Sequence, residues 1–211
     1  MQNYNFLSMN DLLTQDSKPC INHISLAVYN QFYENVLLKL RFSYILPDYD
    51  VLDVSFESLG LFHLLGIHHI DPNMQAKNFS RDIDNGLNFS AFKNNTDLAI
   101  RERFNMMKNR IKMFSCIYYA MRTGRLFATS SGKVHGTQNL MADYVIYKDI
   151  NGEGMTIPLR DTGGKLTPVS ILADKRKYSQ KHIDLTKEKN INRLDIIDMG
   201  AKTVKETVHF F

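Results

Sequence analysis

The chain has few of the features of secreted and membrane proteins. Its only cysteines are Cys20 and Cys116, which have no metal-ligand spacing and do not make a disulfide framework. No apolar run approaches the roughly 18 residues that a membrane-spanning helix needs. The stretch from Met1 to Pro19 lacks the basic start and apolar core of a signal peptide. We therefore expect a cytoplasmic protein with reduced thiols and no membrane contact.

Common catalytic signatures are also missing. His63, His68 and His69 cluster in the sequence, but neither a His-Glu-x-x-His pattern nor a second ligand pair accompanies them. The two Gly-Lys segments at Lys133 and Lys165 lack the frame of a phosphate-binding P-loop, and no Gly-x-Ser-x-Gly elbow exists. The sequence therefore predicts neither a metal nor a cofactor. We expect His68 and His69 at the surface.

Helical periodicity comes before strand-like alternation along the chain. A helix is predicted over about 22–40, with Asn22 as its N-cap. A cap at Thr96 or Asp97 opens a longer amphipathic helix that runs to about Thr123. The predicted strands are 42–46, 51–56, 126–129, 142–147, 155–159 and 166–172. This order predicts an α+β fold in which N-terminal helices pack on a small antiparallel β-sheet.

The remaining segments are less regular. Residues 71–97 are polar and rich in asparagine, which predicts short helices separated by loops. We divide the chain into an N-terminal arm (1–21), one domain (22–189) and a C-terminal tail (190–211). Hydrophobic residues make up 44% of the sequence, so the domain has enough of them to bury a core. The pattern of the tail predicts no particular element.

Positive charge is concentrated in the second predicted helix. The net charge is +4, yet residues 101–125 contain seven lysines and arginines against Glu102 alone. Such a concentration attracts phosphates or an acidic partner. The same pattern is also typical of a solvated helix face, and the sequence leaves both interpretations open.

His63 is the most informative residue, because it lies in the apolar run Phe-His-Leu-Leu-Gly-Ile. Its ordinary pKa of about 6.5 lets an imidazole exchange protons near neutral pH. Such a histidine either satisfies a buried hydrogen bond or is presented for chemistry. The chain also offers Arg110, Ser170 and a polar loop with Lys133 and His135.

These residue types suit cleavage of RNA without a metal ion. RNA supplies its own 2′-hydroxyl as nucleophile, so the protein needs a base, an acid and cations near the phosphate. Histidine serves as base or acid, arginine clamps two phosphate oxygens, and serine hydrogen-bonds them. Composition alone does not select these residues. Arg110 also fits a structural anchor, and Ser170 also fits a partner of a strand backbone.

Four motifs, in order, resemble those of a phage-associated nuclease family. They are Phe-His-Leu-Leu-Gly-Ile-His at 62–68, after a helix and a hairpin, Arg-Ile-x-x-Phe at 110–114, Ala-Asp-Tyr at 142–144 and Pro-Val-Ser at 168–170. Over about residues 22–185 the chain is similar to the Barnase, EndoU, colicin and RelE-like (BECR-fold) nucleases. The resemblance implies helices before a four-stranded antiparallel sheet. It also implies metal-independent RNA cleavage, often by a toxin or phage-conflict effector.

The resemblance also implies roles for three residues. His63 would be the base or acid, Arg110 a phosphate clamp or structural anchor, and Ser170 a hydrogen-bond donor to the substrate. From their charge, five further residues are expected to bind RNA: Arg101, Arg103, Lys108, Lys133 and His135.

We therefore expect an endoribonuclease whose partners are RNA and a neutralising antitoxin or immunity protein. One alternative is a non-catalytic module that binds nucleic acid or protein. Another is a structural protein of a phage or mobile element that has lost activity. The sequence does not determine which RNA is cleaved or how many copies assemble.

Overall fold

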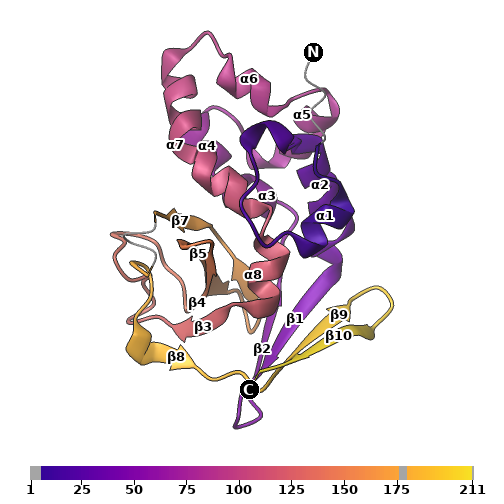
Figure 1. Cartoon of the computed structure of the whole chain (residues 1–211), viewed down its shortest axis with the longest axis vertical. Helices are drawn as coiled ribbons and strands as arrows, with labels where there is room; N and C mark the ends of the chain where they lie inside the picture. Colours follow the sequence, from indigo (N-terminus) through magenta and orange to yellow (C-terminus); the bar gives the residue numbers. More distant parts are fainter. Residues whose placement is uncertain (1–5, 176–179, 211) are drawn as a thin grey trace.

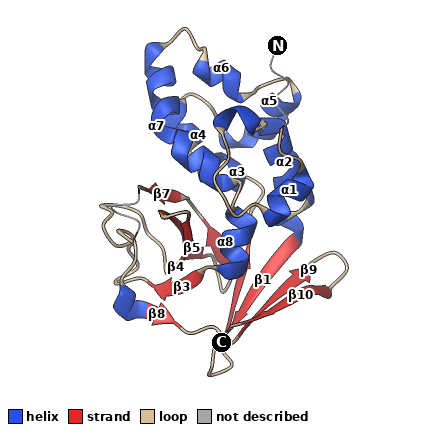
Figure 2. Ribbon diagram, viewed as in Figure 1, coloured by secondary structure: helices blue, strands red, loops and turns tan. Residues whose placement is uncertain are grey.

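Figure 1 shows the computed structural model of the chain, which describes residues 6–175 and 180–210. Helices fill one half of the molecule and strands the other (Figures 1 and 2). The α-helices are α1 (Met9–Thr14), α2 (Leu26–Asn35), α3 (Gly60–Leu65), α4 (Ile67–Ile70), α5 (Phe79–Asp84), α6 (Phe89–Lys93), α7 (Leu98–Phe114) and α8 (Ile117–Thr123). The α+β class and the short helices in 71–97 are confirmed. Across the described residues we find no helix with the length and hydropathy of a membrane span.

The sheet is larger and more varied than the small antiparallel sheet that we predicted. Its strands are β1 (Leu40–Ile45), β2 (Val51–Ser55), β3 (Arg125–Ala128), β4 (Tyr144–Ile150), β5 (Glu153–Asp161), β6 (Leu166–Pro168), β7 (Leu172–Asp174), β8 (Glu188–Lys189), β9 (Arg193–Asp198) and β10 (Thr203–His209). Their order is β10-β9-β1-β2-β6-β5-β4-β3-β8, and β7 pairs with β5. One pairing in this sheet is parallel, between β2 and β6 at Val54 and Leu166. This pairing joins the β1–β2 hairpin to the later strands, which no local sequence signal reveals.

The first predicted helix begins later than expected. Asn22 lies in a 3₁₀ turn (Ile21–His23), and the N-cap of α2 is Ser25. The Ser25 hydroxyl accepts a hydrogen bond from the backbone N–H of Val28 at 3.4 Å. After α2 a second 3₁₀ turn (Leu37–Lys39) leads directly into β1. The helical stretch is therefore shorter than the apolar periodicity indicated.

The second predicted helix is two helices, α7 and α8. Between them the Ser115 hydroxyl donates a hydrogen bond to the carbonyl oxygen of Lys112 at 2.8 Å, a local bond that competes with helix continuation. After the break α8 packs against β4. It ends at Gly124, where a Cβ would lie 2.4 Å from the carbonyl oxygen of Ala120. Glycine is therefore required where the chain enters β3.

The later strands largely follow the sequence pattern. The β4–β5 turn contains Asn151 and Gly152 at φ 54° and 82°, as an Asn-Gly hairpin requires. The predicted strand 166–172 is interrupted, because β6 ends at a proline and β7 begins four residues later. The interruption places Ser170 in a corner between the two strands instead of within a strand.

Both ends of the described chain contribute to the core. Leu12 of α1 is fully buried, and so are Leu194 and Ile196 of β9, which pairs with β1. β9 and β10 pair with each other as an antiparallel hairpin, drawn in yellow in Figure 1. The division into arm, domain and tail stays a prediction, but 190–211 includes two strands of the main sheet.

Candidate active site

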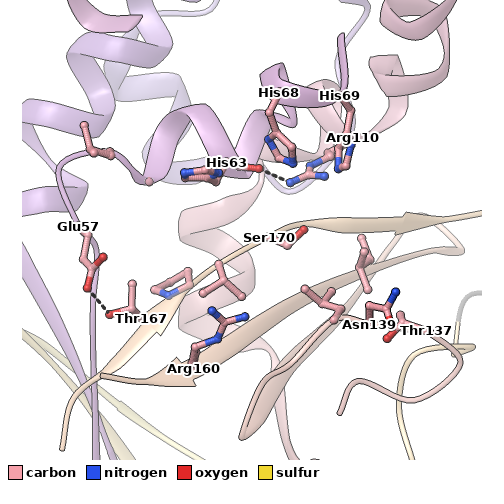
Figure 3. Close-up of a pocket in the computed structure, with 16 residues that line it drawn as sticks. Glu57, His63, His68, His69, Arg110, Thr137, Asn139, Arg160, Thr167 and Ser170 are labelled. Atoms are coloured by element: carbon pink, nitrogen blue, oxygen red, sulfur yellow. Dashed lines mark hydrogen bonds between the residues drawn. The ribbon is translucent and has the colours of Figure 1, made fainter. Parts of the chain in front are cut away.

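An open cleft of about 720 Å³ lies between the helices and the sheet. In Figure 3 its upper side is formed by α3, α4 and α7, and its lower side by β5, β6 and the corner before β7. The residues that matter for chemistry are His63, His68, His69 and Arg110 above and Arg160 and Ser170 below. The three predicted catalytic residues therefore lie on one cleft. Their catalytic roles stay a prediction.

His63 reaches the cleft because its neighbours on α3 are buried. Phe62 is 3% exposed and Leu64 is fully buried, whereas His63 lies on the exposed face. Its ring has no hydrogen-bond partner among the residues that the structure describes. Of the two interpretations of this histidine, the structure favours the presented side chain.

Gly66 brings two further histidines beside His63. Its φ of +74° ends α3, and α4 starts at the next residue. The ring centroids of His63 and His68 are 5.3 Å apart, and those of His68 and His69 are 3.9 Å apart. The imidazoles form a row along the cleft (Figure 3).

Arg110 anchors the end of α3 and also faces the cleft. Its Nε donates a hydrogen bond to the carbonyl oxygen of Leu64 at 2.8 Å, and its Nη2 donates one to the carbonyl oxygen of His63. These carbonyls belong to the last turn of α3, where a positive charge is favourable. Burial lowers the pKa of Arg110 to about 10, so the guanidinium remains charged at neutral pH.

Burial and positive charge keep the three imidazoles neutral. Burial, followed by the charge of Arg110, lowers the pKa values of His63 and His69. The pKa of His68 falls to about 4, because burial is joined by the charges of His69, Arg110 and His63. Among the described residues, His68 Nδ1 is buried without a hydrogen-bond partner. At neutral pH the row therefore consists of free bases beside one fixed cation.

The lower side of the cleft supplies a hydroxyl and a second arginine. Ser170 is 7% exposed, and its hydroxyl has no hydrogen-bond partner in the described parts of the chain. Its corner is fixed by a hydrogen bond from the backbone N–H of Val169 to the carbonyl oxygen of Pro158, at 3.0 Å. Arg160 Nη2 donates to the carbonyl oxygen of Met141 at 3.1 Å, which turns its guanidinium along the cleft.

Among the described residues, Glu57 is the one carboxylate that lines the cleft. It lies on the segment between β2 and α3, and its Oε1 accepts a hydrogen bond from the Thr167 hydroxyl at 3.3 Å. Its own carbonyl oxygen accepts a hydrogen bond from the Tyr33 hydroxyl at 2.5 Å. With neutral imidazoles, the lining carries Arg110 and Arg160 against Glu57. The net positive charge suits a polyanion.

A comparison with protein-family models matches residues 29–202 to the phage-Barnase-EndoU-ColicinE5/D-RelE like nuclease4 family. The chain belongs to this nuclease family. The match covers well over half of the sequence and includes every residue that lines the cleft. The resemblance inferred from the four motifs is thereby confirmed, and family membership supports a nuclease function. Searches of the curated proteins and of the solved structures each returned no match.

The predicted RNA-binding residues of this nuclease domain do not lie together. Arg103 lines a hollow beside the cleft, whereas Lys133 and His135 line a separate cavity of about 150 Å³ next to β3. Arg101 and Lys108 line neither the cleft nor the hollow. The helical repeat distributes the cations of α7 over different faces. Contact of these five residues with RNA stays a prediction.

Sequence reasoning missed part of the cleft. His69 is exposed and His68 half-buried, and the signal for their place on the cleft was their position two and three residues after Gly66. Glu57 and Arg160 gave no local signal, because only the pairing of distant strands brings them to α3. Within residues 6–175 and 180–210, no group of three or more His, Cys, Asp or Glu residues could hold a metal ion.

Proposed function

We propose that this nuclease domain is an endoribonuclease that cleaves RNA by attack of the 2′-hydroxyl, without a metal ion. The observation that carries the proposal is the placement of a neutral His63 and a charged Arg110 opposite Ser170 and Arg160 on one open cleft. This set contains a base and several donors for a phosphate, as such a reaction needs.

His63 acts as the general base in this proposal. Its lowered pKa leaves the imidazole unprotonated at neutral pH, ready to accept the proton of the 2′-hydroxyl. The 2′-oxygen then bonds to phosphorus while the bond to the 5′-oxygen breaks. His69 gives its proton to that leaving oxygen, since a bound phosphate opposes the charge of Arg110 and raises the pKa of the nearby ring. The products are a 2′,3′-cyclic phosphate and a 5′-hydroxyl.

Arg110, Arg160 and Ser170 stabilise the charge that develops on the phosphate. Two nitrogens of Arg110 hold α3, and its Nη1 has no hydrogen-bond partner among the described residues. Nη1 can therefore donate a hydrogen bond to a non-bridging phosphate oxygen from a fixed position. A donor held in place stabilises the transition state more than a mobile one does. The free hydroxyl of Ser170 donates from the opposite side.

The biological part of the proposal concerns the target and its control. We propose that the enzyme acts on cytoplasmic RNA as a toxin or phage-conflict effector, with an antitoxin or immunity protein as its inhibitor. Its support is the family match, whose description includes phage, colicin and RelE-like nucleases. We expect induced expression to kill cells and His63→Ala to abolish this killing. Growth of induced cells at the rate of uninduced cells would contradict this role.

Purified protein incubated with total RNA in EDTA tests the chemistry. We expect cleavage that leaves 2′,3′-cyclic phosphate ends and that stops when each 2′-hydroxyl is replaced by hydrogen. His63→Asn should abolish cleavage, whereas His209→Asn, a matched change on β10 outside the cleft, should not. Intact RNA in EDTA combined with cleavage in Mg²⁺ would contradict the metal-free mechanism. RNA that binds tightly but is never cut would support the non-catalytic alternative.

A further inference from the structure

A second hollow of about 490 Å³ adjoins the cleft between α7 and β7. The two share His69, Arg110 and Leu172, so a chain that occupies the cleft can continue into the hollow. Its floor is apolar, with Ile171 and Ala173 beside Leu172. The cleft for the scissile phosphate therefore has an apolar neighbour on one side.

The wall of this hollow is one face of α7. Arg103, Met106, Met107 and Arg110 are spaced by three, four and seven residues from the first, so they lie on the same side of the helix. Two cations thus flank two thioethers. At 1.5 Å of rise per residue, the two arginines are separated by about 10 Å along the helix.

The thioethers offer an unusual open surface. Met106 is 67% exposed, although a methionine more often fills a core, and Met107 is partly buried beside Gly66. Methionine is soft and polarisable, and it packs well against flat rings. The face of a nucleobase is such a ring, and stacking on it is tolerant of sequence.

Some polar groups of the hollow already have partners, whereas Asp174 Oδ2 is buried without a hydrogen-bond partner among the described residues. Asn109 hydrogen-bonds Lys18 and Glu153, and His182 pairs with Asp174 at 3.3 Å. Arg103 has no hydrogen-bond or ion-pair partner in the described residues. Its guanidinium is therefore available to an anion, as a phosphate at the end of the hollow would require.

We propose that this face of α7 binds the nucleotide next to the scissile phosphate. Arg110 holds the scissile phosphate, the adjacent base lies on Met106 and Met107, and Arg103 holds the next phosphate. The inference deepens the proposed function, since it takes the ligand to be RNA. It assigns contact with RNA to Arg103 but not to Arg101 or Lys108, a distinction that the charge of α7 alone does not make.

Binding of two octamers that cannot be cleaved tests the inference independently of catalysis. One is a 2′-O-methyl RNA octamer with normal bases, and the other has the same backbone with every base removed. By fluorescence anisotropy, Met106→Ala should weaken binding of the first at least about fivefold and leave the second unchanged, because only the first can stack. Arg103→Gln should weaken both to a similar extent, because both carry phosphates.

Matched controls come from exposed positions outside the cleft and the hollow. Leu98 on α7 is 63% exposed, and Leu98→Ala should leave both affinities within about twofold of wild type. Arg81→Gln on α5 is the control for Arg103→Gln, because it removes one positive charge far from the hollow. It should also leave both affinities within about twofold of wild type. If Met106→Ala weakened the binding of both octamers equally, or of neither, the proposed subsite would be overturned. RNA that binds in this way but is not cleaved would leave the subsite standing and contradict only the nuclease mechanism.

Discussion

The guanidinium of Arg110 occupies the space that a side chain at Gly66 would need, so a glycine at this position gives it room. A Cβ built on Gly66 would be 3.1 Å from both Cζ and Nη1 of Arg110 and equally close to Met107 Sδ. The φ of +74° at Gly66 is also costly for any other residue type. One glycine therefore ends α3, positions the histidine row and admits the guanidinium.

Gly66→Ala should lower both stability and activity. The left-handed backbone costs about 1–2 kcal/mol in the free energy of unfolding, and the displaced guanidinium lowers cleavage by at least about tenfold. Urea denaturation and initial cleavage rates measure the two effects. Gly86→Ala is the control, because Gly86 has a φ of +100° but nothing within 4 Å of its added Cβ. Equal activity of the two variants would contradict a role for this close approach.

Arg110→Lys should show that the charge alone is insufficient. A lysine cannot donate to two carbonyls and a phosphate from a planar fork, so we expect a loss of about 1–3 kcal/mol in stability and a fall in kcat of at least about tenfold. Arg160→Lys, which loses a single backbone contact, should reduce kcat with a smaller loss of stability. The comparison of kcat with urea midpoints separates anchoring from phosphate binding. An Arg110→Lys enzyme with wild-type kcat would leave this arginine a structural anchor only.

The sequence predicted much of the cleft because its residues lie in short motifs. His63, Arg110 and Ser170 come from three of the four motifs and line one cavity. The Ala-Asp-Tyr motif has a structural part: Asp143 Oδ2 accepts a hydrogen bond from the backbone N–H of Asp161 at 2.7 Å. This contact ties the residue before β4 to the end of β5, next to Arg160. A sequence motif therefore indicates that a site lies nearby, but it does not show which residues of the motif face the cleft.

The features that the sequence did not predict depend on distant contacts. The parallel β2–β6 pairing, the β9–β10 hairpin on β1 and the position of Glu57 all depend on segments far apart in the chain. Periodicity also does not reveal the break between α7 and α8, since apolar residues continue at helical intervals through Ser115. Periodicity shows which face is buried, but the elements that cover it decide where a helix ends.

The pKa of His63 should depend on Arg110. Burial and the arginine charge both lower it, so the imidazole loses its proton below the ordinary pH of about 6.5. In Arg110→Gln the electrostatic cause is removed, and the pKa should rise toward, but not beyond, that ordinary value. NMR titration of the ring protons measures this without any need for activity. An unchanged pKa in Arg110→Gln would contradict the electrostatic coupling.

His68 should make the fold less stable as the pH falls. Its pKa is about 4 in the folded protein, so between about pH 6.5 and pH 4 the unfolded chain binds a proton that the folded state does not. The stability that comes from keeping His68 neutral in the folded state is therefore fully present above about pH 6.5 and is lost as the pH falls toward about 4. His68→Asn should therefore lose less stability than wild type between pH 7 and about pH 5, as measured by urea midpoints. A variant that loses stability as steeply as wild type contradicts the assignment.

Leu194→Ala should show whether the last strands are part of the folding unit. Leu194 is fully buried on β9, whereas Val204 on β10 is 55% exposed. Removing the buried side chain should cost about 2–4 kcal/mol in the free energy of unfolding, because a cavity forms in the core. Val204→Ala should cost less than about 1 kcal/mol. Both values follow from urea denaturation monitored by tyrosine fluorescence. A single transition shifted by Leu194→Ala means that the segment after residue 190 folds together with the cleft, whereas an unchanged midpoint means that it is an independent tail.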